Sequence, residues 1–251
     1  MRTIRLTLEY DGARYRGWQR QAEAPTIQAA VEAAVASVLG HHAEVVGASR
    51  TDAGVHATGQ VAHFRADTRI PPEKWPFVLN AVLPPDIVVR EAAAASDDFH
   101  ARFSAIGKRY RYTILAQPQP SALWRERAFH VYRPLDVARM RAAAECLVGE
   151  HDFAAFRDAG CEALSTRRTL HGVKLTEAFP FLHLEVEGNA FLYHMVRIVA
   201  GTLVDIGTGR LAADCVPALL ASGDRRLAGQ TAPACGLCLE AVFHAAGRPD
   251  A

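Results

Sequence analysis

Residues 45–64 read VVGASRTDAGVHATGQVAHF, and this stretch decides how the chain is interpreted. Val45 and Val46 end one apolar run and Gln60–Phe64 forms another, so we expect two strands joined by a loop. Gly47 and Gly54 give that loop unusual backbone freedom. The loop carries Asp52 next but one to Arg50, whose positive charge can keep the carboxylate ionised. An aspartate before a glycine is also a common turn residue, so the loop by itself leaves a structural role open.

Composition limits the classes of protein to consider. The chain has 251 residues, half of them hydrophobic, which is enough for one large domain or two smaller ones. It lacks an apolar run of membrane-spanning length, and Met1–Arg5 resembles a strand rather than a signal peptide. Five cysteines in such a chain favour reduced thiols and a cytoplasmic location. Cys235 and Cys238 have metal or redox spacing, but no second pair exists and Cys238 alternates with leucines as in a strand.

Two segments combine cations with aromatic rings, as proteins that bind RNA do. One is residues 14–20, RYRGWQR, and the other is residues 100–133. The longer segment has a single acid, Glu126, against seven basic residues: Arg102, Lys108, Arg109, Arg111, Arg125, Arg127 and Arg133. A solvated face with its aromatic rings turned toward the core would give the same composition, so both interpretations remain.

The apolar periodicity predicts two similar α+β halves, 1–104 and 105–246. Each reads strand, helix, strand, strand, helix, strand, as in two fused ferredoxin-like halves with antiparallel-rich mixed sheets and a catalytic cleft between them. The first half has strands at 4–10, 43–48, 59–66 and 87–89, a helix that Thr26 caps and Gly40 ends, and a helix at 72–82. The second has strands at 108–115, 168–177, 181–187 and 237–243, a helix capped by Asp136, and helices at 190–206 and 212–221.

The helix predicted at 190–206 has one unusual residue. Arg197 is the only charge between Ala190 and Val204. Tyr193, His194, Arg197 and Gly201 would share one narrow face of this helix. A guanidinium in so apolar a helix is costly without an anion, although it can also form a structural ion pair or extend to the surface. We expect Arg197 to pair with a carboxylate, and Asp52 is the best candidate.

These motifs together resemble the tRNA pseudouridine synthase A family. The match lies in residues 50–61 (RTDAGVHATGQV), 10–19 (YDGARYRGWQ), 99–105 (FHARFSA), 108–112 (KRYRY), 191–197 (FLYHMVR) and 232–237 (APACGL). The blocks occur in the family's order across nearly the whole chain. Many members have glycine where this chain has Ser49, which replaces one small residue with another.

The resemblance implies an isomerase that converts uridine to pseudouridine at positions 38, 39 and 40 of tRNA, without cofactor or metal. It assigns Asp52 as the catalytic carboxylate and leaves open whether it attacks C1′, adds to C6 or removes the 2′ proton. Arg197 would orient Asp52, and Tyr110 would stack on the uracil. The substrate would also contact Arg50 and Leu237, and Arg14, Arg16 and Arg20 would bind phosphate. A homodimer that binds the tRNA anticodon stem-loop is implied as well.

Three other interpretations fit parts of the sequence. A non-catalytic RNA-binding protein would need the pairing of Asp52 with Arg197 to be incidental. An aspartic hydrolase would use two such loops sharing a proton, and the chain has one. The group His41, His42, His56 and His63 could suggest a metal, but its spacing does not match a ligand set.

Overall fold

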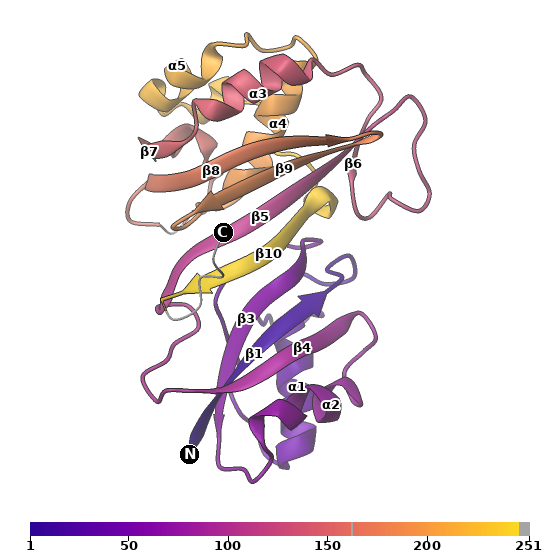
Figure 1. Cartoon of the computed structure of the whole chain (residues 1–251), viewed down its shortest axis with the longest axis vertical. Coiled ribbons are helices and arrows are strands. Elements are labelled where there is room, and N and C mark those ends of the chain that lie inside the picture. Colours follow the sequence, from indigo (N-terminus) through magenta and orange to yellow (C-terminus); the bar gives the residue numbers. More distant parts are fainter. Residues whose placement is uncertain (162, 246–251) are drawn as a thin grey trace. The chain divides into compact units, whose positions relative to one another are not determined.

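The computed structural model describes residues 1–161 and 163–245, and it confirms the predicted α+β class with antiparallel-rich mixed sheets. The chain divides into two compact units (Figure 1). Among the described residues, the first contains 1–106 and 238–245, and the second contains 107–161 and 163–237. The last strand, predicted for the C-terminal half, pairs with a strand near Ala57 and groups with the first unit.

The sheet of the first unit has the strand order β4-β1-β3-β10. Strand β1 (Arg2–Tyr10) lies antiparallel between β3 (His56–Ala66) and β4 (Ile87–Ala95). Strand β10 (Leu237–His244) runs parallel to β3, and the short β2 (Val46–Gly47) pairs antiparallel with β3. Alternate residues of β1 are buried, as predicted: Ile4, Leu6, Leu8 and Tyr10.

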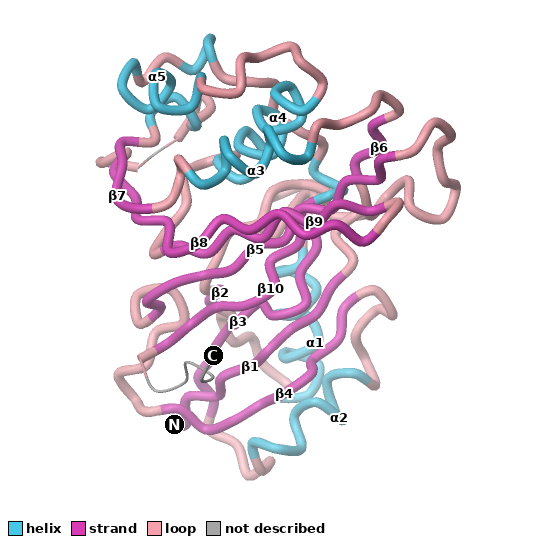
Figure 2. Tube along the Cα trace, turned by 45° about the horizontal axis from the view of Figure 1, so that its top comes forward, coloured by secondary structure: helices cyan, strands magenta, loops and turns pink. Residues whose placement is uncertain are grey.

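Two helices cover one face of this sheet (Figure 2). Helix α1 (Ile27–Leu39) has Thr26 as its N-cap, accepting a hydrogen bond from the Ala29 amide, and Gly40 ends it with a φ of 78°. Both ends are as predicted. The second helix is shorter than the predicted 72–82: a 3₁₀ turn (Pro72–Lys74) leads into α2 (Trp75–Asn80), because residues 81–86 form a turn before β4. Phe64 and Trp75 pack edge to face in the core.

The strands of the second unit are mostly antiparallel. Strand β5 (Ala105–Ala116) pairs with β9 (Phe181–Gly188), which forms a hairpin with β8 (Arg167–Ala178). Two short strands were not predicted: β6 (Phe129–Val131), which runs parallel to β5, and β7 (Gly149–Asp152), which runs antiparallel to β8. Each is too short to carry a periodic signal, and only its partner strand defines it.

Three helices lie beside the strands of the second unit (Figure 2). Helix α3 (Val137–Glu145), capped by Asp136 as predicted, packs on β8 and on α4 (Met195–Gly207). Helix α5 (Cys215–Ser222) follows, and 3₁₀ turns occur at Ala154–Phe156, Arg225–Leu227 and Ala234–Gly236. No helix in the described part of the chain is long and apolar enough to cross a bilayer.

The predicted start of the helix that carries Arg197 was also wrong. The apolar run from Ala190 predicted a helix from about 190, but α4 begins at Met195, because His194 has a left-handed backbone with a φ of 60°. Tyr193 and His194 therefore precede the helix and do not share a helical face with Arg197. Hydrophobic periodicity cannot show this break, since residues 190–194 are apolar enough to continue the pattern.

Candidate active site

The loop that carries Asp52 is held in place by buried polar contacts in the first unit. Gln60, fully buried in β3, accepts from the Ser49 amide at 3.2 Å and donates to the Ser49 carbonyl at 2.7 Å. The Tyr10 and Thr51 hydroxyls are 2.8 Å apart in a buried hydrogen bond. These contacts hold the backbone on the N-terminal side of Asp52, so the Asp52 side chain projects from a fixed backbone position.

A second loop, residues 11–20, packs directly against the Asp52 loop. The Trp18 amide donates to the Thr51 carbonyl at 3.0 Å, and the Gly54 amide donates to the Tyr15 carbonyl at 3.2 Å. The Tyr15 hydroxyl donates to Asp86 at 2.7 Å, and burial together with this bond raises the pKa of Tyr15 above its usual value. The two family-like segments, residues 10–19 and 50–61, therefore pack against each other in the fold.

The exposure of the charged residues in these loops differs. Asp52 is half-buried, whereas Arg50, Arg14 and Arg16 are exposed. The Arg20 guanidinium lies 2.8 Å from the carboxylate of Glu32, a residue that is only 4% exposed. Arg20 therefore has a structural partner in the fold in addition to any contact with RNA.

Tyr110 and Tyr112 are both buried on β5, and their surroundings differ. The Tyr110 ring lies edge to face with Phe191, with 5.0 Å between the ring centres. The Tyr112 hydroxyl donates to the Pro233 carbonyl at 2.7 Å, and burial raises the pKa of Tyr112 above its usual value. A Cβ atom on Gly236 would meet the Tyr112 ring, so Tyr112 is part of the packing beneath the segment that leads to Leu237.

Arg197 lies in the first turn of α4 and has a defined hydrogen-bond partner. Its Nε donates to the Ala232 carbonyl at 2.8 Å, and its own carbonyl accepts from the Ala232 amide at 3.1 Å. These two bonds join the helix to the segment 229–236, and Leu237 follows as a buried residue at the start of β10. The guanidinium of this half-buried residue is thus oriented in part by backbone, which the sequence did not predict.

The site residues named from the sequence, with the exception of Tyr110, lie in segments that match a known family. The sequence profile of the tRNA pseudouridine synthase family matches residues 7–104 and 143–244. The chain belongs to this family. Its place there confirms the resemblance to pseudouridine synthases and the prediction of an isomerase.

Several curated relatives span nearly the whole chain. The tRNA pseudouridine synthase A of Ruminiclostridium cellulolyticum is 47% identical over 97% of this chain and all of its own length. The enzyme of the same name from Moorella thermoacetica is 48% identical over 96% of this chain and 99% of its own. That of Alcanivorax borkumensis is 48% identical over 95% of this chain and 90% of its own.

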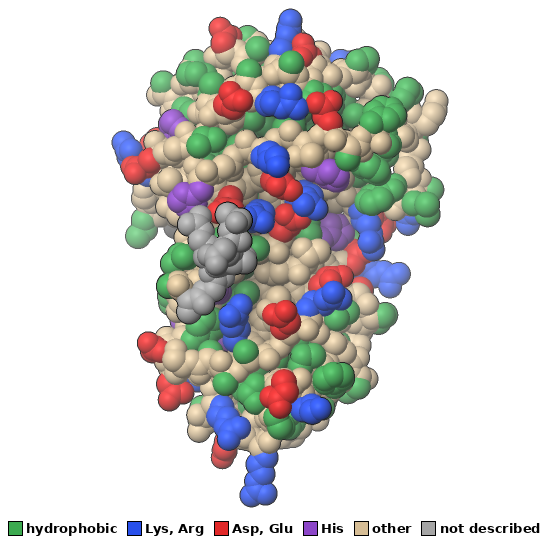
Figure 3. Space-filling view, viewed as in Figure 1, with side chains coloured by type: hydrophobic (Ala, Val, Ile, Leu, Met, Phe, Trp, Pro, Cys, Tyr) green, Lys and Arg blue, Asp and Glu red, His purple; other side chains and the backbone are tan. Residues whose placement is uncertain are grey.

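The charge pattern of this family member differs from the one expected along the sequence. Arg109 pairs with Glu187 at 3.0 Å, and Arg111 pairs with Glu185 at 2.9 Å, across the β5–β9 ladder. Figure 3 shows basic and acidic side chains interleaved on this face. The local excess of cations at 100–133 is therefore partly neutralised in space, because the acids come from a strand far away in the sequence.

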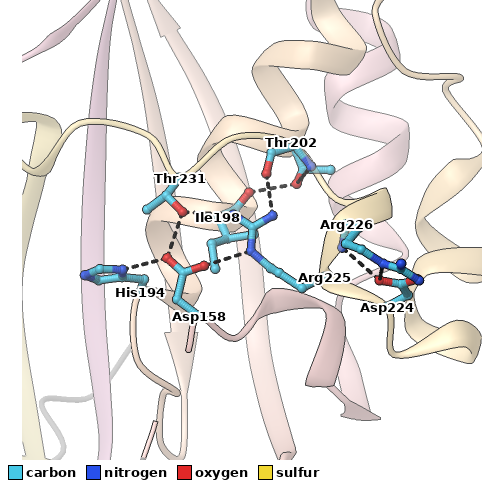
Figure 4. A network of polar contacts seen from close by, with 9 residues as sticks. Asp158, His194, Ile198, Thr202, Asp224, Arg225, Arg226 and Thr231 are labelled. Carbon is cyan, nitrogen blue, oxygen red and sulfur yellow. Dashed lines mark hydrogen bonds and ion pairs between the residues drawn. The ribbon is translucent and has the colours of Figure 1, made fainter. Parts of the chain in front are cut away.

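A polar cluster that the sequence did not predict lies around Asp158. Its carboxylate accepts from His194 at 2.7 Å, Thr231 at 2.9 Å and Arg225 at 3.0 Å (Figure 4). These four residues are spread over 74 positions, from 158 to 231, so no motif or spacing in the sequence groups them together. Within the described residues, no group of three or more His, Cys, Asp or Glu side chains could hold a metal ion, and the five cysteines are free thiols.

Apolar side chains are exposed on one part of the second unit. Figure 3 shows them gathered over the loop before β6 and at the tip of the β8–β9 hairpin. They are Leu123, Trp124, Tyr132 and Phe179, of which Leu123 and Phe179 are nearly 90% exposed. A pocket of about 310 Å³ lies beside them, lined in part by Tyr132, Arg133 and Phe179. We call these four side chains the apolar patch.

Proposed function

We propose that this chain converts uridine to pseudouridine at positions 38, 39 and 40 of tRNA, in the anticodon stem and loop. The observation that carries the proposal is the Asp52 loop, whose sequence resembles the family's catalytic motif and whose backbone is held by Gln60, Tyr10 and Trp18. A half-buried carboxylate on a rigid loop is what a reaction at the sugar–base bond needs.

The reaction is an isomerisation that needs no external group. The N1–C1′ bond breaks, the uracil turns, and a C5–C1′ bond forms. The proton leaves C5 and N1 gains one, so atoms and electrons balance without an oxidant, a metal or a nucleotide. Asp52 is assigned as the carboxylate that acts on the sugar or base, and the target uridine must leave its stack to reach it.

The other site residues have supporting roles in this proposal. Arg197 orients Asp52, and Tyr110 stacks on the extruded uracil and handles the C5 proton. Leu237 packs against the base, and Arg50 holds phosphate or fills the space that the base leaves. Exposed Arg14 and Arg16 bind the backbone of the RNA, whereas Arg20 contributes mainly through its ion pair with Glu32.

The test is to map pseudouridine in tRNA incubated with the purified protein and no cofactor. We expect new pseudouridine at positions 38–40 and release of tritium from C5-labelled uridine. An Asp52→Asn preparation should give neither signal. Modification confined to other tRNA positions would contradict the assignment of positions, and binding without modification would support the non-catalytic alternative.

We also propose that the protein acts as a homodimer in the cytoplasm and that the apolar patch contributes to the contact between copies. An exposed set of large apolar side chains is costly in water unless a partner covers it. Light scattering on the wild type and on a Tyr132→Ser, Phe179→Ser variant tests this. We expect a dimer for the wild type and a monomer for the variant, and a monomeric wild type would contradict the proposal.

A further inference from the structure

The Asp158 carboxylate joins three segments of the second unit. It accepts from His194 just before α4, from Thr231 in the segment before β10, and from Arg225 in a 3₁₀ turn (Figure 4). Arg225 also donates to the Thr231 hydroxyl at 2.9 Å and to the Gly229 carbonyl at 2.9 Å. Burial disfavours the charged form of Asp158, yet the bonds from His194, Thr231 and Arg225 hold its pKa below the usual value. The carboxylate is therefore ionised at neutral pH.

Two of the residues that hydrogen-bond to Asp158, His194 and Thr231, lie close in the chain to Arg197 and to its partner Ala232. His194 is three residues before Arg197, and its carbonyl accepts from the Ile198 amide at 3.0 Å as α4 begins. Thr231 precedes Ala232, whose amide and carbonyl both hydrogen-bond to Arg197. Asp158 thus ties together the start of the helix that carries Arg197 and the backbone segment that orients its guanidinium.

The backbone at His194 makes this support necessary. A non-glycine residue with a φ of 60° is in a conformation that side chains disfavour, and it persists only where surrounding contacts determine it. The Asp158 amide also donates to the Tyr193 carbonyl, at 3.4 Å. Residue 158 therefore contacts both residues that precede α4, by its backbone and by its side chain.

We propose that Asp158 is a positioning residue for Arg197. It sets where α4 begins and where Ala232 lies, and so fixes the direction of the Arg197 guanidinium. The inference rests on the proposed function in one respect, because it takes Arg197 to act in pseudouridine formation. A misplacement of about 1 Å in such a group costs on the order of 100-fold in rate.

The first test is Asp158→Asn, which keeps the size of the side chain and removes its charge. We expect the single-turnover rate constant for pseudouridine formation to fall about 10- to 100-fold. The dissociation constant for tRNA should change less than about twofold, because the phosphate-binding loops are untouched. Asp224→Asn is the matched control: Asp224 pairs with Arg226 at 2.6 Å on the exposed side of the same 3₁₀ turn (Figure 4), and its loss should leave the rate unchanged.

A double-mutant cycle separates positioning from a general loss of stability. Arg197→Lys alone should slow the reaction, and adding Asp158→Asn to it should slow it little further, because the group being positioned is already gone. Equal losses from Asp158→Asn in both backgrounds would overturn the inference. Should Asp158→Asn fail to fold, Thr231→Val removes one bond to the carboxylate and should show the same coupling in milder form.

A measurement without substrate distinguishes failure of this inference from failure of the proposed function. The Arg197 Nε–H group, bonded to the Ala232 carbonyl, should give a slowly exchanging NMR signal in the wild type. Asp158→Asn should speed its exchange at least about 10-fold, and Asp224→Asn should not. Unchanged exchange would overturn the inference even if the enzyme is active, while lack of activity in the wild type would overturn only the proposed function.

Discussion

Gly17 lies against the backbone of Asp52: a Cβ atom at Gly17 would sit 3.0 Å from the Asp52 carbonyl carbon and closer still to the Thr51 carbonyl oxygen. Gly17 also has a φ of +86°. Gly17→Ala should therefore both strain its own backbone and push the Asp52 loop away. We expect a rate of pseudouridine formation at least about 10-fold lower, measured in single turnover.

Gly40→Ala is the control for that prediction. Gly40 has a similar φ of +78°, but nothing lies within 4 Å of the Cβ position. The variant should lose about 1 kcal/mol in free energy of unfolding and keep its activity. If Gly17→Ala and Gly40→Ala had equal rates, the close approach to Asp52 would have no catalytic importance.

Tyr110 and Tyr112 should respond differently to loss of their hydroxyls. Tyr110→Phe keeps the ring against Phe191 and should slow turnover strongly with tRNA affinity retained. Tyr112→Phe removes the donor to Pro233 and should cost about 1 kcal/mol in free energy of unfolding with little effect on rate. Chemical denaturation and single-turnover assays on both variants measure this. A Tyr112→Phe enzyme as slow as Tyr110→Phe would contradict the division of roles.

Asp52 and Arg197 should behave as one catalytic unit. Asp52→Asn should abolish pseudouridine formation with little loss of tRNA affinity, because size is kept and the reacting charge is lost. Arg197→Lys keeps the charge and loses the planar fork and the Nε bond to Ala232, so it should slow turnover more than it weakens folding. The double variant should be little worse than Asp52→Asn alone. Additive losses would indicate independent roles.

The salt dependence of tRNA binding should separate three arginines. Replacing the exposed Arg14 and Arg16 with Ala should reduce the slope of log affinity against log salt by about 1 to 2, with stability unchanged. Arg20→Ala should instead lower the free energy of unfolding by about 1 kcal/mol, since buried Glu32 loses its cation. Arg69→Ala is the control, because Arg69 is exposed beyond the C-terminal end of β3, and it should change neither the salt slope nor the free energy of unfolding.

Stability should fall as the pH drops from about 6.5 to about 4. Burial, with His100 and Arg65 nearby, lowers the pKa of His63 from 6.5 to about 4. Between these two pKa values the unfolded chain binds a proton at His63 that the folded chain does not. The contribution of His63 to the free energy of unfolding is therefore complete above pH 6.5 and is lost progressively as the pH falls toward 4. The difference is about 3 kcal/mol. His63→Gln should flatten the pH dependence of the free energy of unfolding, and an unchanged slope would contradict the assignment.

Local signals account for much of the fold that was predicted. Alternating apolar residues predicted β1, and Thr26 with Gly40 predicted both ends of α1, because capping and burial periodicity act over a few residues. Family motifs likewise identified Asp52, Tyr110 and Arg197 as site candidates, since chemistry requires those side chains in a fixed local context.

What the sequence by itself determined is therefore the α+β class, most elements and the family. Only the tertiary structure decided which donors surround Asp158, that Arg109 and Arg111 face glutamates on β9, and that Arg197 bonds to Ala232. It also placed the start of α4 at Met195, where His194 interrupts an apolar run. The physical reason is that hydrogen bonds and ion pairs join segments far apart in the chain, whereas periodicity and capping record only near neighbours.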